Sequence, residues 1–162
     1  MGSNEGKSKL VTMTPVVDTA IYASADQLGS LVELTNAMDD SSGTGTIVSV
    51  TVLDKAAQSS TATLLIFNDK PVVASVDNAA LNISDAEMSS KCVGVIPIPT
   101  ASFVALSASS AMAVLNVQLL VNSVKSADNA GGRSLWAILR SGGTPTYTST
   151  SDLTIKIGIR QD

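Results

Sequence analysis

The sequence predicts an all-β protein, a single antiparallel β-sandwich or jelly roll with one short helix near residues 84–90. Two observations favour this class: apolar residues alternate with polar ones at a period of two, and Gly-, Ser- and Asp-rich turns separate the alternating segments. The third is composition. Hydrophobic residues make up 44% of the 162 residues and charged residues only 15%, against about 25% charged in a typical soluble domain. Such a chain buries the core of one ordinary domain.

The clearest alternating segment is residues 153–160, near the end of the chain. Its odd positions are the aliphatic residues Leu153, Ile155, Ile157 and Ile159, and its even positions are Thr, Lys, Gly and Arg. This pattern predicts a half-buried strand, because side chains alternate between the two faces of a sheet. Each aliphatic side chain contributes about 1.5–3 kcal/mol when fully buried. The other face meets solvent or a partner.

Further strands are expected, giving roughly eight in all. They lie at residues 11–22, 31–34, 46–53, 62–67, 93–98, 112–121 and 134–139. The segment 62–67 is apolar on both faces, which indicates a central, covered strand. Pro97 inside the segment 93–98 favours a sheet edge or the end of a strand, since proline donates no ladder hydrogen bond.

One short helix follows from a capping box. Ser84 is the expected N-cap, and Glu87 stands three residues later. The helix is expected to end near Ser90. A further helical turn is expected to begin at Thr100 or Ser102.

The chain is divided into a flexible N-terminal arm, residues 1–9, and a single β-sandwich domain, residues 10–162. The arm is polar and contains two glycines and the two lysines Lys7 and Lys9. Two interpretations stay open: the arm becomes ordered on a neighbouring molecule, or it is a solvated tail.

Most enzyme and cofactor chemistry is excluded by what the sequence lacks. It contains no histidine and one cysteine, Cys92, so it has neither Ser-His-Asp or Cys-His catalysis nor a His- or Cys-ligated metal. Its net charge is −4, without a basic cluster for nucleic acid. No apolar run reaches the about 18 residues of a membrane span. We therefore expect no enzyme, cofactor, metal, nucleic acid or membrane, and Cys92 as a buried small hydrophobe.

A few residues allow both a functional and a structural interpretation. Asp39 and Asp40 lie in a Ser/Gly loop, where a solvated turn is favoured over a calcium site that would need several more oxygen ligands. Trp136 is either a core residue or a contact with a partner. If Leu135 and Ala137 face the core, then Trp136 faces the opposite side, which favours the partner contact.

Several short blocks of the sequence resemble small virion proteins of tailed bacteriophages. The blocks are residues 45–55, 64–67, 77–80, 83–87, 93–96, 143–147, 149–154 and 161–162. The resemblance extends over roughly residues 16–162, and the blocks after residue 142 are the most specific. It implies a head decoration or cement protein, a virion structural protein with a jelly-roll or sandwich fold. It implies no catalytic residues.

The resemblance also implies partners and a location. The protein would bind the outer surface of the major capsid protein shell as a homotrimer and stabilise the head, after synthesis in the host cytoplasm. Lys7, Lys9 and Trp136 are then the candidate partner contacts, with the two lysines facing an acidic capsid surface. The alternative is a phage tail or fibre protein, or a lectin-like carbohydrate-binding sandwich, for which Tyr147 is the candidate sugar platform.

Overall fold

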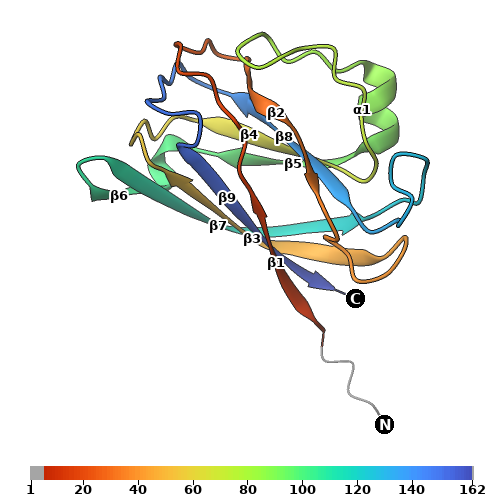
Figure 1. The fold of residues 1–162 in the computed structure, drawn as a ribbon. Helices are drawn as coiled ribbons and strands as arrows, with labels where there is room; N and C mark the ends of the chain where they lie inside the picture. Colours follow the sequence, from red (N-terminus) through yellow and green to blue (C-terminus); the bar gives the residue numbers. More distant parts are fainter. Residues whose placement is uncertain (1–5, 162) are drawn as a thin grey trace.

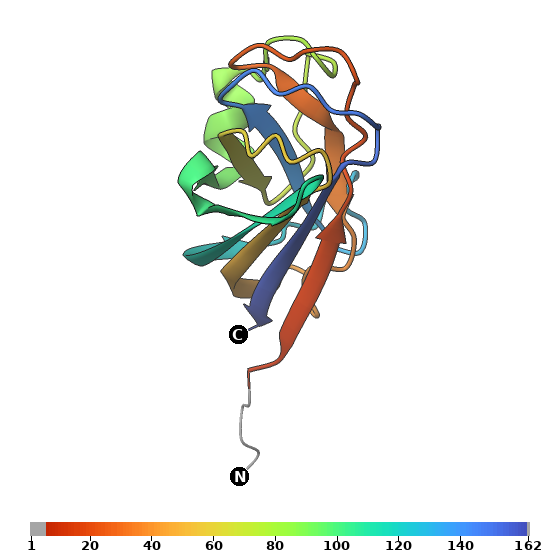
Figure 2. The same ribbon diagram turned by 90° about the vertical axis from the view of Figure 1, so that its left-hand side faces the viewer.

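A computed structural model describes residues 6–161 of the chain. Two antiparallel β-sheets pack face to face, which confirms the predicted all-β sandwich (Figure 1). One short helix, α1, lies beside the sandwich on the side of the smaller sheet (Figures 1 and 2). No helix of the described residues is both long and apolar enough to cross a membrane.

The two sheets contain all nine strands of the described chain. The five-stranded sheet has the order β1 (Ser8–Met13), β9 (Leu153–Gln161), β3 (Thr44–Asp54), β7 (Ser110–Asn122) and β6 (Phe103–Ser107). The four-stranded sheet has the order β2 (Gln27–Leu34), β8 (Leu135–Ser141), β4 (Ala62–Phe67) and β5 (Cys92–Ile98). With β6 set aside, the strand order is that of a jelly roll, β1-β9-β3-β7 facing β2-β8-β4-β5. Successive strands among these lie in opposite sheets, except that β4 and β5 are neighbours in one sheet.

Most of the expected strands appear close to their predicted bounds. The strand β4 has the predicted ends and is buried on both faces between β8 and β5. Pro97 lies in β5, an edge strand as predicted. In β9 the odd positions are buried, while Lys156 and Arg160 are exposed. The period-two pattern therefore identifies these strands correctly.

The structure differs from the expected strands at three places. The strand predicted at residues 31–34 begins earlier, at Gln27. The predicted strand 11–22 begins earlier, at Ser8, and ends at Met13, because Pro15 follows and cannot donate a ladder hydrogen bond. The strand β6 was not predicted, because it is only five residues long and mostly exposed, so no buried face marks it.

The helical predictions are confirmed. The helix α1 covers Asp85–Lys91, and the Ser84 hydroxyl accepts a hydrogen bond from the Glu87 backbone N–H at 3.2 Å. A 3₁₀ turn, η1, covers Thr100–Ser102.

The predicted arm, residues 1–9, lies in part outside the described residues. Within the described part, Ser8 and Lys9 already belong to β1, where they pair with Arg160 and Ile159 of β9. The boundary at residue 9 is therefore wrong, because the backbone of Lys9 is held in the sheet.

The main core fills the space between the sheets with aliphatic side chains. Ile155, Ile157 and Ile159 of β9 are fully buried there. Tyr22 and Tyr147 join this core edge to face, with ring centroids 5.9 Å apart and an interplanar angle of 71°. A second, smaller cluster lies on the far side of the four-stranded sheet, around Trp136.

We expect Trp136→Ala to lower the free energy of unfolding by about 3–5 kcal/mol, because it removes a large buried side chain and leaves a cavity. Urea unfolding followed by circular dichroism measures the change. Leu10→Ala, at a side chain that is 62% exposed, is the control and should cost less than about 0.5 kcal/mol. Equal effects of the two substitutions would contradict the burial of Trp136.

Candidate interaction surface

The outer faces of the two sheets differ in what lies over them. Residues 68–91, which include α1, lie over the outer face of the four-stranded sheet (Figures 1 and 2). We call this segment the cover. Its apolar side chains pack on Trp136, Phe67 and Ile138 of the sheet. The partly buried residues around this cluster are Leu31, Val73, Leu81, Ile83, Met88 and Cys92.

The cover overturns the prediction that Trp136 contacts a partner. Trp136 does face away from the main core, as its register opposite Phe67 and Glu33 requires. However, the cover buries it to 3% exposure. Its contacts are therefore made within its own chain.

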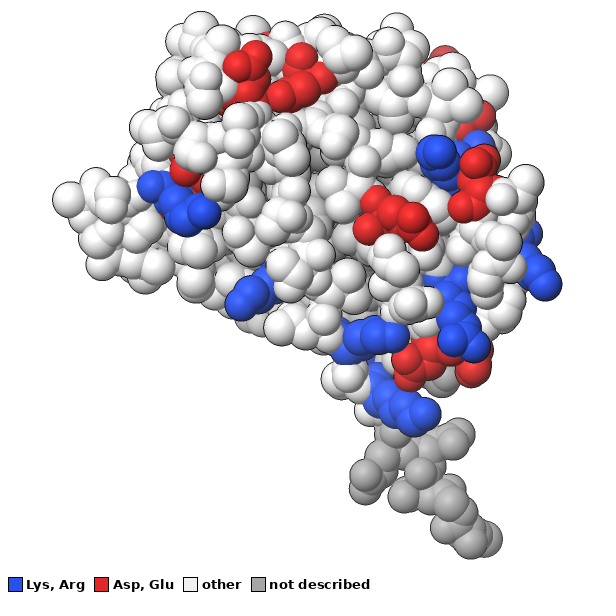
Figure 3. Space-filling model, viewed as in Figure 1, with Lys and Arg blue, Asp and Glu red and all other residues white. Residues whose placement is uncertain are grey.

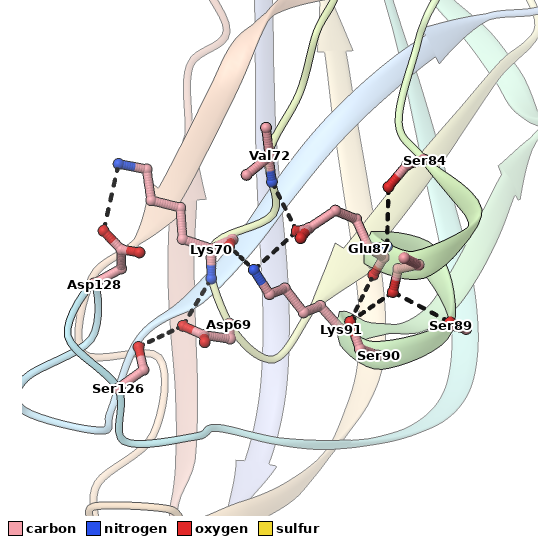
Figure 4. A network of polar contacts seen from close by, with 11 residues as sticks. Asp69, Lys70, Val72, Ser84, Glu87, Ser89, Ser90, Lys91, Ser126 and Asp128 are labelled. Atoms are coloured by element: carbon pink, nitrogen blue, oxygen red, sulfur yellow. Dashed lines mark hydrogen bonds and ion pairs between the residues drawn. The ribbon is translucent and has the colours of Figure 1, made fainter.

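A network of polar contacts joins the helix α1 to the first residues of the cover (Figure 4). The Glu87 carboxylate accepts a hydrogen bond from the Val72 N–H at 2.8 Å and pairs with the Lys91 ammonium at 2.8 Å. Lys91 also donates to the carbonyl of Lys70 at 2.8 Å. The hydrogen bond from Lys91, followed by that from Val72, lowers the pKa of Glu87. Glu87 thus holds α1 against the start of the cover.

A second group of contacts joins the cover to the loop after β7 (Figure 4). Ser126 donates a hydrogen bond to the Asp69 carboxylate at 2.7 Å. Lys70 lies 3.9 Å from the Asp128 carboxylate. The cover is therefore fixed at both its helix and its first turn.

Within residues 6–161 no such cover lies over the outer face of the five-stranded sheet, and we call this face the bare face. None of its outward-facing side chains is fully buried. They are Ser8, Leu10 and Thr12 of β1, Thr154, Lys156, Gly158 and Arg160 of β9, Thr46, Ser49, Thr51 and Leu53 of β3, Met112, Val114, Asn116, Gln118 and Leu120 of β7, and Val104 of β6.

The bare face combines small hydroxyl and aliphatic side chains with positive charge. Its only charged residues in the described chain are Lys156 and Arg160, and it carries no carboxylate there. Several of its aliphatic side chains are more than half exposed, among them Leu10 at 62% and Leu120 at 68%. Charged groups are sparse elsewhere too, as most of the surface in Figure 3 is uncharged. Such a face suits a contact with another protein.

At one side of the sandwich, the bare face continues into an open groove. The groove, of about 320 Å³, lies between β5 and β7 and is lined by residues 95–97 and 115–119. Next to the residues that line the groove, the sheets approach each other closely, since a Cβ on Gly94 would stand 2.5 Å from the Leu119 side chain. Leu106, Val104 and Val114 lie exposed on the same side.

The two predicted lysine contacts are placed differently by the structure. Lys9 pairs with Asp39 of its own chain at 3.2 Å. Its position opposite Ile159 also puts it on the inner face of β1. The prediction that Lys9 contacts a partner is therefore not supported, because its charge is already neutralised. Lys7 is exposed, and its carbonyl accepts a hydrogen bond from the Gln161 N–H at 2.7 Å.

The carboxylates serve local structure. Asp39 is used by Lys9, and Asp40 is exposed in a turn that the Gly43 N–H closes onto its carbonyl. Asp77 accepts hydrogen bonds from the Tyr22 hydroxyl at 2.7 Å and the Gly29 N–H at 2.6 Å. Among residues 6–161, no three acidic or thiol side chains form a group that could hold a metal ion.

Two further candidate functional residues, Tyr147 and Cys92, are also packed within the chain. Tyr147 is 4% exposed, and burial raises the pKa of its hydroxyl. Its ring packs on Tyr22 in the core and offers no platform to a sugar. Cys92 is half-buried beside Trp136, and burial raises the pKa of its thiol, which disfavours the reactive thiolate.

The bare face is the feature that sequence reasoning identified only in outline. The alternation in β9 indicates one face for the core and one for solvent or a partner, but it does not show which strands lie beside β9.

Comparison with protein-family models finds no match to this chain, and comparison with curated proteins finds none either.

We expect Glu87→Gln to lower the midpoint of thermal unfolding by a few degrees at neutral pH. Because the folded state lowers the pKa of Glu87, its contribution is present above the ordinary carboxyl pKa and is lost as the pH falls through the folded value. The difference between wild type and variant should therefore shrink on acidification. Calorimetry at about pH 7 and about pH 3 measures it.

Asp85→Asn is the control for this prediction. Asp85 lies in the same helix and forms no ion pair with a described residue. A difference that stays constant between the two pH values for Glu87→Gln would contradict the role of the carboxylate.

Proposed function

We propose that the chain is a structural protein of a tailed-bacteriophage virion, a decoration or cement protein that binds the outer surface of the major capsid protein shell. The resemblance of several sequence blocks supports this role. The structural observation that carries it is the bare face, a complete sheet surface without a cover. In this proposal the protein is located on the head exterior after synthesis in the host cytoplasm.

The chemistry of the bare face agrees with docking and requires no catalysis. A stable contact buries about 1,200–2,000 Å² in total, counting both partners. The aliphatic and hydroxyl side chains supply contact area whose desolvation costs little free energy, because these side chains carry no charge. Lys156 and Arg160 lie two positions apart on one face of β9, with Gly158 between them. Their complement is an acidic patch on the shell, which would orient the docking protein.

A cement protein stabilises a shell by mass action. It binds the assembled shell and not the separate subunits, so its binding free energy adds to the stability of the assembly. The contact therefore needs area and complementarity across subunit boundaries. A rigid jelly roll with one face fixed by its own cover and the other left open meets that need.

The alternative, a lectin-like or tail-fibre module, loses its candidate sugar platform because Tyr147 is buried. The three other described aromatic residues besides Tyr22 do not replace it. Trp136 and Phe67 are buried under the cover, and Phe103 is partly buried against the main core.

The copy number in purified phage particles tests the proposal. Quantitative mass spectrometry should find this chain in numbers comparable to the major capsid protein. A handful of copies per particle would move the protein to the neck, tail or fibre. Absence from the particle would overturn the virion role.

Charge reversal on β9 tests the docking face. The double variant Lys156→Glu, Arg160→Glu should bind phage heads that lack the protein at least about tenfold more weakly, because two complementary charges become repulsive. Lys125→Glu, on an exposed loop outside the bare face, is the control and should bind like wild type. Equal binding by both variants would show that docking uses another surface.

A further inference from the structure

The strand β7 has a free edge beyond Ala113. On one side it pairs with β3 over its whole length. On the other side it pairs with β6, but only from Ser110 to Ala113, because β6 begins at Phe103. In the described chain, residues 114–122 therefore have no strand on that side. Their outward backbone N–H and C=O groups are available to another strand.

The edge strand β6 is only five residues long, and the three other sheet edges carry features that discourage strand pairing. The strand β1 is six residues long and contains Lys9. The strand β2 has a break in register between Leu28 and Val32, and it carries Glu33. The strand β5 contains Pro97.

The free part of β7 lacks such features. Residues 114–122 include neither a proline nor a charged residue. Its register with β3 shifts between Ile47 and Ser49, opposite Val117 and Gln118, but its side chains continue to alternate between the two faces. Even positions stay exposed and odd positions stay partly buried.

We propose that the free edge of β7 pairs with the same edge of a second copy of the chain, antiparallel about Val117. In this register Val114 of one copy lies opposite Leu120 of the other, and Asn116 lies opposite Gln118. Leu115 lies opposite Leu119 in the same way. Every pair joins like with like, aliphatic with aliphatic and amide with amide, which is what a two-fold contact of one surface with itself requires.

The start of β6 limits this contact at one end. Because Phe103 occupies the edge beside Ala113, the second copy can pair only beyond Ala113. The pairs of like residues select the register about Val117, which uses the seven positions 114–120. The pairing also covers Val114 and Leu120, which are 62% and 68% exposed.

This pairing gives a dimer in place of the trimer that the resemblance implies. The two-fold axis stands perpendicular to the joined sheet, so the bare faces of both copies lie on the same side. A consequence that rests on the proposed function is that each dimer presents two sets of Lys156 and Arg160 to the shell. Binding through two linked faces strengthens docking without any new contact.

Light scattering coupled to size exclusion, on the full chain at tens of micromolar, tests the pairing. The wild type should have twice the mass of the 16.5 kDa chain. The double variant Asn116→Lys, Gln118→Lys places like charges opposite each other across the axis and should weaken the dimer by about tenfold or more. The variant Asn116→Lys, Gln118→Glu places opposite charges there and should restore the dimer.

Leu10→Lys, Thr12→Lys is the matched control, since these residues also lie two positions apart on the bare face, but at the β1 edge. It should remain a dimer, and circular dichroism should show that all variants are folded. A monomeric or trimeric wild type would overturn the proposal, as would a dimer that the lysine pair leaves intact or that the Lys–Glu pair fails to restore. Absence of the protein from phage particles would overturn the virion role and leave the dimer standing.

Discussion

The structure depends on the dry aliphatic layer between its two sheets, and β9 is the strand on which that layer is built. Ile155, Ile157 and Ile159 are fully buried, and β9 pairs with β1 on one side and β3 on the other. Because branched aliphatic side chains are short and stiff, they hold the two sheets in close contact over a wide area. The same alternation necessarily leaves Lys156 and Arg160 on the opposite, outer face.

The asymmetry between the two outer faces follows from where the chain uses its few aromatic residues. Phe67 and Trp136 face outward from the four-stranded sheet, and such large apolar surfaces require a cover. The five-stranded sheet has Thr, Ser, Gly and smaller aliphatic residues at the equivalent positions, and these tolerate exposure. One face is thereby closed by the chain itself, and the other remains available for contact.

The sequence was sufficient for most of the strands and for the helix, and insufficient for what covers them. Period-two alternation and the Ser84 cap are local signals, so the bounds of β4 and α1 were predicted well. The exposure of Trp136 and Tyr147 depends on segments far away in the chain, which no local pattern contains. The face of Trp136 was predicted correctly, because register fixes it, but its burial depends on the cover. The jelly-roll order likewise arises from long-range pairing. The short β6 pairs only with β7, in a local hairpin, and was missed because no buried face marks it.

The length of β6 determines how the sheet ends, and this matters because an unpaired, uncharged strand is a hazard in a protein with so little surface charge. If β6 ran along the whole of β7, the apolar edge would be paired within the chain. Because β6 begins only at Phe103, the edge is open beyond Ala113 and has an obstacle at that end. A contact in the register of like residues pairs with one copy and then leaves no free edge on residues 114–120. Self-association through this edge therefore ends at the dimer. An edge without an obstacle would allow other registers, which extend into larger assemblies.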